Sequence, residues 1–299
     1  MITPSVEPDV LKKYVQAGVI AREAREFGVA NVKAGGSSLE LANAIEDLIR
    51  KRGGECAFPV NIGVNEVAAH YTPSMNDDLR FKTGDVVKVD VGAHVDGYPA
   101  DTAATMEVGT KNHSALIEAA RDALRICIEM VAPGTTVSAI GGAVSRTIRA
   151  TGFKPVENLT GHSMEKWNLH AGLSIPNIET KDRSALVEGM VVAIEPFSTD
   201  GKGKVGGSSR GSIYRIVRER RAPQEVGEMF ERIKRQFGLF PFAGRWCDSF
   251  GPNAAQHLSK MVRLGMVMGY PILTEVAHGV VAQAEHSVIV TKDGCRVLT

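Results

Sequence analysis

Residues 84–90, GDVVKVD, are echoed about a hundred residues later by GMVVAIE at residues 189–195. In each copy a glycine precedes an apolar, largely β-branched run that ends on an acid, Asp90 or Glu195. Such a run predicts a β-strand. A carboxylate has no structural use at the end of so apolar a strand, because a buried charge is costly unless it is paired or binds a cation. The repeat therefore predicts two related half-structures that hold a cation between them.

The dipeptide Asp96-Gly97 lies between two segments with the period of a strand, and it favours a two-residue hairpin turn. With that turn, Gly92 pairs with Asp101, and Asp90 lies on the same face two residues away. The two carboxylates become diagonal neighbours, with backbones roughly 7–8 Å apart. Side chains that reach toward each other across this gap can share two cations about 3.5–4 Å apart. A change of one residue in the turn would send Asp101 to the opposite face.

Two more candidate ligands lie in similar surroundings. Glu285 is embedded in β-rich sequence with no arginine close to it, and His162 offers a single ring nitrogen. One imidazole with four carboxylates suits divalent Mn, Fe, Co or Zn at a hydrolytic site better than a structural zinc bound by thiolates. A solvated acidic strand edge is the alternative. It is disfavoured because Asp90 and Asp101 both lie inside β-rich sequence, where like charges repel unless a cation or a proton neutralises them.

The helical pattern repeats as well, so that the order helix, helix, strands, acid occurs twice. We predict an α/β (α+β) fold whose two halves are related by a pseudo-twofold axis. Chance recurrence is the alternative, and the paired acid-ended strands argue against it. Ser38 is the expected N-cap of the second helix, because residues 36–39 resemble residues 134–137. The predicted helices span residues 9–30, 38–53, 114–130 and 137–150.

Residues 218–268 differ in composition and pattern from the preceding sequence and match nothing in the first half of the chain. Two helical patterns, at 224–237 and 253–264, flank a stretch with prolines and glycines. We interpret this segment as a compact helical insertion. The catalytic domain would then comprise residues 1–217 and 269–299.

Composition limits the classes of function. The chain has 299 residues, 43% of them apolar, and a formal net charge of +1, which provides no field for binding nucleic acid or a membrane surface. No apolar run approaches the roughly 20 residues that a membrane span needs. The amino terminus lacks the basic start and apolar core of a signal peptide, and the four cysteines are isolated. We therefore expect a cytoplasmic protein, a monomer, with no membrane or specific nucleic-acid partner.

Motifs along essentially the whole chain resemble those of the methionine aminopeptidases, and within them type II. The long helical segment before the last candidate ligand is the mark of type II. The matching motifs are Ala57-Phe58-Pro59, Ala68-Ala69-His70-Tyr71-Thr72-Pro73, Val89-Asp90-Val91-Gly92, Gly161-His162-Ser163, Leu169-His170-Ala171-Gly172, Ala193-Ile194-Glu195-Pro196-Phe197 and Ala282-Gln283-Ala284-Glu285-His286.

The resemblance implies the pita-bread fold, in which two half-units surround a dinuclear centre. It implies two divalent metal ions (Co, Mn, Fe or Zn) as cofactors, and two substrate-side histidines, His70 and His170. The implied metal ligands are Asp90, Asp101, His162, Glu195 and Glu285.

The implied activity is removal of the initiator methionine from nascent or newly made polypeptides when the second residue is small. A metal-bridged hydroxide would attack the peptide carbonyl, with Glu195 as the proton shuttle. His170 would donate to the developing oxyanion, and His70 would steady the scissile amide or the leaving nitrogen.

Phe58, Leu169 and Tyr270 would line an apolar slot for the methionine side chain, although ordinary core packing is an equal alternative for each of them. The chain departs from the resemblance in one respect. Relatives often carry a further pocket histidine after the glycine-rich stretch, and here no histidine lies between Glu195 and His257. One wall of the pocket is therefore unassigned.

Two other functions remain open at this stage. An X-Pro peptidase, or prolidase-like hydrolase, shares the fold and ligand set but usually carries an extra N-terminal domain, for which the first repeat leaves no room. A non-catalytic relative that binds ribosomes or RNA is the other. The basic run 215–221 would suit a ribosome contact or a solvated surface, but retention of every ligand and both histidines argues against lost catalysis.

Overall fold

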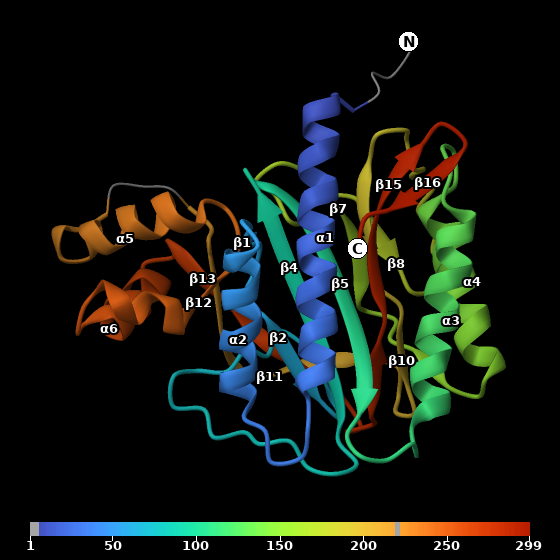
Figure 1. Ribbon diagram of the computed structural model, residues 1–299, viewed down its shortest axis with the longest axis horizontal. Coiled ribbons are helices and arrows are strands. Elements are labelled where there is room, and N and C mark those ends of the chain that lie inside the picture. The colour runs from blue at the N-terminus through green and yellow to red at the C-terminus, as the bar shows by residue number, and fades with distance from the viewer. Residues whose placement is uncertain (1–5, 219–221) are drawn as a thin grey trace.

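The computed structural model describes residues 6–218 and 222–299, in which two half-units share one large sheet (Figure 1). The strands of this sheet run in the order β1-β4-β5-β15-β9-β7-β8, with β2 paired to β4 and β16 paired to β15. Its strands are β1 (Glu55–Cys56), β2 (Asn61–Val64), β4 (Val86–Val95), β5 (Tyr98–Glu107), β7 (Thr160–Met164), β8 (Ser174–Pro176), β9 (Val191–Ile194), β15 (Glu285–Thr291) and β16 (Gly294–Val297).

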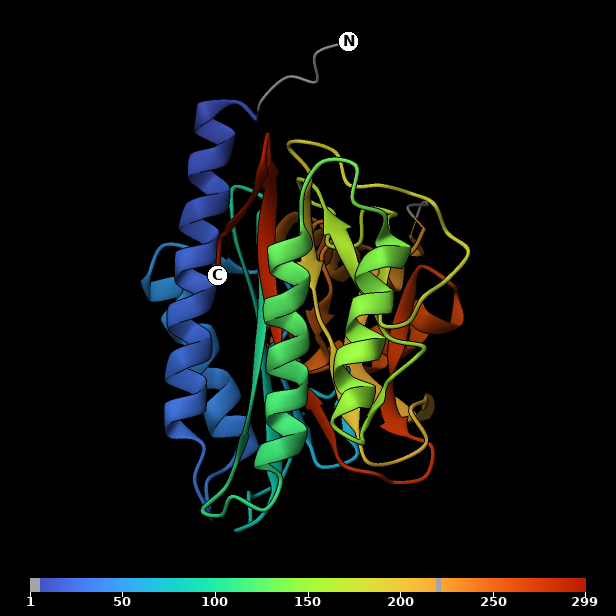
Figure 2. The ribbon, with the colours of Figure 1, turned by 90° about the vertical axis from the view of Figure 1, so that its right-hand side faces the viewer.

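Each half-unit carries a pair of helices (Figure 2). The first pair packs on β4, β5 and the short strands beside them, and the second pair packs on strands of the other half. Within the described ranges, no helix is long and apolar enough to cross a membrane. The helices are α1 (Pro8–Asn31), α2 (Ser38–Lys51), α3 (Ser114–Met130) and α4 (Val137–Ala150).

The internal repeat predicted from the sequence is present, with a shift of one residue at the helix caps. Ser37 caps α2 by accepting from the Glu40 amide at 3.3 Å, and Thr136 caps α4 in the same way. The prediction that Ser38 caps α2 was wrong, because Ser38 is already helical and buried. The two caps also make equivalent bridges, Ser37 with Arg80 and Thr136 with Ala185.

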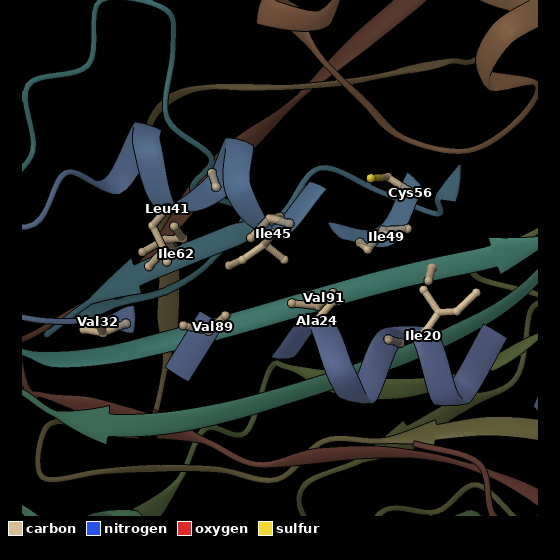
Figure 3. Packing of buried hydrophobic residues seen from close by; sticks show 14 of the residues in the cluster. Ile20, Ala24, Val32, Leu41, Ile45, Ile49, Cys56, Ile62, Val89 and Val91 are labelled. Carbon is tan, nitrogen blue, oxygen red and sulfur yellow. The ribbon is translucent and has the colours of Figure 1, made fainter. Parts of the chain in front are cut away.

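Each half-unit has a hydrophobic core of its own, as expected if each arose as a separate fold unit. In the first half, Ile20 and Ala24 of α1 and Ile45 of α2 meet Val89 and Val91 of β4 (Figure 3). The equivalent core of the second half lies between α3, α4 and strands β9 and β15. The buried faces of the helices thus fix the outer side of the sheet and leave its other side for the site.

Two smaller sheets lie beside the large one. One has the order β14-β10-β6, from β14 (Val281–Gln283), β10 (Phe197–Thr199) and β6 (Lys154–Pro155). The other has the order β12-β11-β13-β3, from β12 (Phe242–Ala243), β11 (Val205–Ile216), β13 (Val267–Glu275) and β3 (Val67–Ala69).

The helical segment predicted for residues 218–268 lies between β11 and β13, at the left edge of the molecule in Figure 1. It contains α5 (Gln224–Phe237), the 3₁₀ helix η1 (Gly244–Phe250) and α6 (Ala254–Arg263), which enclose a separate apolar cluster. Residues 219–221 of the predicted basic run, and residues 1–5, lie outside the described ranges.

Candidate metal centre and active site

The β4–β5 hairpin has the register that the Asp96-Gly97 turn predicted. Gly92 pairs with Asp101 and Asp90 pairs with Ala103, so the two acids share one face as diagonal neighbours. A β-carbon on Gly92 would lie 2.2 Å from the Phe58 ring, so only glycine lets that ring approach this face. The hairpin therefore places two carboxylates and an aromatic wall together.

Glu195 and Glu285 lie where the chain leaves the large sheet, and the sequence did not reveal this. A strand that ends on Glu195 was expected, and β9 does end beside it, with Glu195 and Pro196 between β9 and β10. A continuous strand was expected through Glu285, but β14 and β15 are separated at Ala284. The neighbouring strands β9 and β15 pair in the large sheet, whereas β10 and β14 pair in the small one. The two glutamates thus lie at the point where the sheets diverge, which opens space between them.

His162 of β7 brings the imidazole to the same point. Its Nε2 lies 3.5 Å from Oδ2 of Asp101 and 3.9 Å from Oε1 of Glu195. One ligand atom from each of Asp101, His162 and Glu285 lies within 4.8 Å of the others. A single ion could therefore be held by three side chains that come from β5, β7 and β15.

The electrostatics fit a cation. Burial raises the pKa of Asp101 to about 7, and burial followed by repulsion among the carboxylates raises the pKa values of Asp90, Glu195 and Glu285 well above their usual range. In the described part of the chain, no lysine or arginine forms an ion pair with any of the four.

Buried polar atoms without a hydrogen-bond partner provide a second indication. They include Oδ1 of Asp90 and Oδ1 of Asp101, as well as Nδ1 of His162. Buried polar atoms in native proteins are nearly always satisfied, so unpartnered carboxylate oxygens beside an imidazole fit a site that binds a cation. Hard oxygen donors with one imidazole fit a divalent metal, and the residues present therefore suit the cofactor that the resemblance implied.

A cavity of about 300 Å³ encloses this cluster, and every predicted site residue lines it. The predicted ligands, the two histidines and the three slot residues thus face one space, although their individual roles stay predictions. Its lining includes Phe58, His70, Asp90, Asp101, His162, Leu169, His170, Glu195, Tyr270 and Glu285.

The two substrate-side histidines each contact another ring of the cavity lining. The His170 ring lies against the His162 ring, with centroids 4.3 Å apart, and the His70 ring meets Tyr270 edge to face at 5.1 Å. Burial lowers the pKa of His170 to about 3 and also lowers that of His70. Both rings are therefore neutral near pH 7, and a neutral imidazole can donate one hydrogen bond without carrying a charge.

Several lining residues were missed. They include Ile213 of β11, Leu273 of β13 and Pro241, which are far apart in sequence and line the cavity. Asn61 of β2 pairs with Asp90 and also lines the cavity. The apolar character of these segments resembles ordinary core, so the sequence carries no signal for Ile213, Leu273 or Pro241. Asn61 was the exception, as a polar residue within an apolar run.

Comparisons with known proteins agree with this geometry. Residues 12–292 match the metallopeptidase family M24. A methionine aminopeptidase of Methanocaldococcus jannaschii is 40% identical over 98% of this chain and 100% of its own length. Among solved structures, a thermophilic Arx1 superposes with a TM-score of 0.88 at 18% identity, covering 98% of this chain and 91% of that one.

The methionine aminopeptidase of Thermotoga maritima superposes with a TM-score of 0.70 at 22% identity, over 100% of this chain and 99% of that one. At such identities the solved structures speak for the fold alone, which is the pita-bread fold that the resemblance implied. The match in sequence over nearly the full length carries the assignment further. The chain belongs to metallopeptidase family M24 and, within it, to the methionine aminopeptidases.

Proposed function

We propose that this chain removes the N-terminal methionine from new polypeptides whose second residue is small. The observation that carries the proposal is the convergence in a cavity of one imidazole and four carboxylates, two of them buried and two half-buried, without a lysine or arginine paired to them in the described ranges. A methionine aminopeptidase related over the full length supports the substrate class.

Two divalent ions, with Co, Mn, Fe or Zn as candidates, would be held by Asp90, Asp101, His162, Glu195 and Glu285. Bound there, they would supply Lewis acidity and lower the pKa of water toward neutrality. Side chains of the protein would transfer the proton and orient the substrate.

Glu195 is the proposed proton shuttle. Its side chain is 15% exposed, so it lies at the cavity surface, and its Oε1 faces His162. Because burial and neighbouring carboxylates raise its pKa, the Glu195 carboxylate holds a proton more readily than an exposed glutamate does. His170 would donate a hydrogen bond to the carbonyl oxygen as negative charge develops, and His70 would hold the scissile amide. Donors aimed at charge that appears only in the transition state raise kcat more than they tighten binding.

The methionine side chain would enter the apolar part of the cavity. Phe58 and Leu169 are 6% and 7% exposed, and Tyr270 completes this side. Ile213 and Leu273 face the same space, where the further histidine of some relatives is missing. One misplaced methylene in such a slot costs only roughly 1–3 kcal/mol, so the slot would tolerate close analogues of methionine.

We also propose that the catalytic domain comprises residues 1–217 and 269–299, with residues 218–268 as the helical insertion of type II enzymes. The separate apolar cluster around α5 and α6 supports this division. We expect the protein to act in the cytoplasm as a monomer that meets its substrates at or after the ribosome.

The test is metal-dependent release of methionine from Met-Ala-Ser, with Ala-Pro and Gly-Pro peptides as controls. We expect turnover of Met-Ala-Ser only. Turnover of the proline peptides alone would favour the X-Pro peptidase, and binding of ribosomes without any turnover would favour the non-catalytic alternative. Near-native turnover by Glu195→Gln with both metals bound would contradict the shuttle role.

A further inference from the structure

Gln283 is a buried polar residue to which neither the ligand set nor the proposed mechanism assigns a role. It is 2% exposed and lies in β14, two residues before Glu285. Its backbone is fixed on both sides: its amide donates to Oγ1 of Thr105 at 2.8 Å, and its carbonyl accepts from the same hydroxyl at 2.6 Å. The strand also pairs with Phe197 of β10. The side chain therefore projects from a well-held point.

The side-chain amide of Gln283 contacts both glutamates at the divergence of the two sheets. Its Nε2 donates to Oε2 of Glu195 at 3.4 Å and to Oε2 of Glu285 at 3.3 Å. The amide nitrogen has two hydrogens, so it can serve one carboxylate with each. One neutral side chain thus contacts two of the four carboxylates.

The orientation of this amide follows from chemistry. If it were reversed, Oε1 would face two carboxylate oxygens, and ionised carboxylates can only accept hydrogen bonds. With Nε2 in place, Oε2 of Glu195 is engaged by Gln283, and its Oε1 faces His162 at 3.9 Å. The amide therefore decides which oxygen of Glu195 is turned toward the cavity.

A neutral donor has an advantage here over a charged one. A lysine or arginine at position 283 would neutralise the glutamates and compete with a metal ion, whereas another carboxylate would add to the repulsion. An amide holds both glutamates while leaving their negative charge available.

We propose that Gln283 is a positioning residue that presets Glu195 and Glu285 for metal binding and turns one oxygen of Glu195 toward the substrate. This inference rests on the proposed function, because it assigns Gln283 a task within the same metal site. Outer-sphere partners of metal ligands typically change metal affinity or activity by about 10–100-fold when they are replaced.

The test compares wild type with Gln283→Met, which keeps the length of the side chain and removes both donors, and with Gln283→Asn, which keeps the amide but cannot reach both glutamates. Gln256→Met, at an exposed position of α6, is the matched control. Calorimetric titration of the metal-free proteins with Mn²⁺ gives the affinity, and urea unfolding of the same proteins gives the stability.

We expect Gln283→Met to weaken Mn²⁺ binding by about 10–100-fold, Gln283→Asn to weaken it less, and Gln256→Met to leave it unchanged. Wild-type affinity in both Gln283 variants would overturn the proposal, even if their stability fell, because that result indicates packing alone. If Gln283→Met does not fold, Gln283→Asn and the side-chain amide resonances of wild type decide. Amide hydrogens that exchange as in a free glutamine would also overturn it.

Failure of the proposed function looks different. In that case the wild-type protein itself would bind no divalent ion and release no methionine. A wild type that does both, alongside Gln283 variants with unchanged affinity, would refute only the positioning role.

Discussion

Two of the sites with buried acid in the described part of the chain are built in opposite ways. Glu46 of α2 and Arg245 of η1 form an ion pair in which each side chain is 2% exposed. Glu46 also accepts from Nε1 of Trp246 at 2.7 Å and from the amide of Val60 at 3.2 Å, and Arg245 donates to Oγ1 of Thr72 at 2.7 Å. The cavity has four acids and, among the described residues, no lysine or arginine paired to them.

The charges of Glu46 and Arg245 stabilise the fold, whereas the charges of the cavity carboxylates are available for chemistry. Around Glu46, nearly every polar atom has its partner within the chain, so the pair joins α2 and the insertion to the segment that carries Phe58 and His70. In the cavity, carboxylate oxygens are left without partners, and protons or cations must come from solution. Removing a charge should therefore have opposite effects on the stability of the metal-free protein at the two places.

The largest effect is expected from Asp101→Asn. Loss of a ligand carboxylate should lower kcat/KM for Met-Ala-Ser by more than the roughly 100-fold that loss of an outer-sphere partner costs. The metal-free variant should be at least as stable as wild type near pH 8, because asparagine relieves the repulsion among the acids. Activity assays and urea unfolding of the metal-free proteins test both statements. A metal-free variant that is several kcal/mol less stable than wild type would contradict the view that repulsion among the cavity acids destabilises the metal-free protein.

Arg245→Met tests the other cluster. It leaves Glu46 buried without its counter-ion, which typically costs about 3–5 kcal/mol. Urea unfolding should show this loss, while Mn²⁺ affinity of the folded protein stays unchanged. The double variant Glu46→Leu with Arg245→Met is the control, and it should lose less than the sum of the single losses because no unpaired charge remains. Additive losses would show that the two residues act independently.

The sequence predicted the parts of the site that depend on local rules. The Asp96-Gly97 turn fixed the register of Asp90 and Asp101, and the repeat of acid-ended strands placed Glu195. These inferences hold because a strand alternates its faces and a two-residue turn leaves one register. The failures have physical causes too. The break at Ala284 depends on which sheet each segment joins, and a single apolar run does not encode that choice.

Contacts between segments that are far apart in the sequence could not be predicted. Glu46 and Arg245 are 199 residues apart, and no pattern in either segment predicts that they meet. Gln283 belongs to one of the matching motifs, but its role could not be predicted, because a donor that serves two acids is recognisable only when both acids are in place. Ser38 was predicted as the N-cap in place of its neighbour Ser37. Two adjacent serines offer the same capping signal, and only the backbone conformation distinguishes them.

His170→Ala is expected to have a smaller effect than loss of a ligand. Removing one donor to a developing oxyanion typically lowers kcat by about 10²–10³-fold. KM and the amount of bound metal should change little, because His170 is not among the proposed ligands. Steady-state kinetics on Met-Ala-Ser test this, with His257→Ala on α6 as the matched control. An unchanged kcat/KM in His170→Ala would remove His170 from the mechanism.

The smallest expected effect is the pH dependence of the metal-free protein, to which two kinds of group contribute with opposite signs. The pKa of Asp101 is raised to about 7, so its contribution to stability is complete at low pH and is lost as pH rises through 7. The pKa values of His162 and His170 are lowered to about 4 and 3, so their contribution is present above about 6.5 and is lost as pH falls below it. Above about pH 6.5, where the contribution of the histidines is largely established, stability should decline toward pH 8, because the raised pKa values of the other three cavity acids act in the same direction as that of Asp101.

The decline should amount to about 1.4 kcal/mol per pH unit for each proton by which the folded and unfolded states differ. Urea unfolding from pH 6 to 8 in the presence of a chelator measures it. Asp101→Asn should flatten the decline, and saturating Mn²⁺ should abolish it, because a bound cation takes the place of the proton. Glu46→Gln retains the four cavity acids, so its decline should match that of wild type even though its overall stability is lower. A decline that survives in Asp101→Asn would assign the titration to another acid of the cavity.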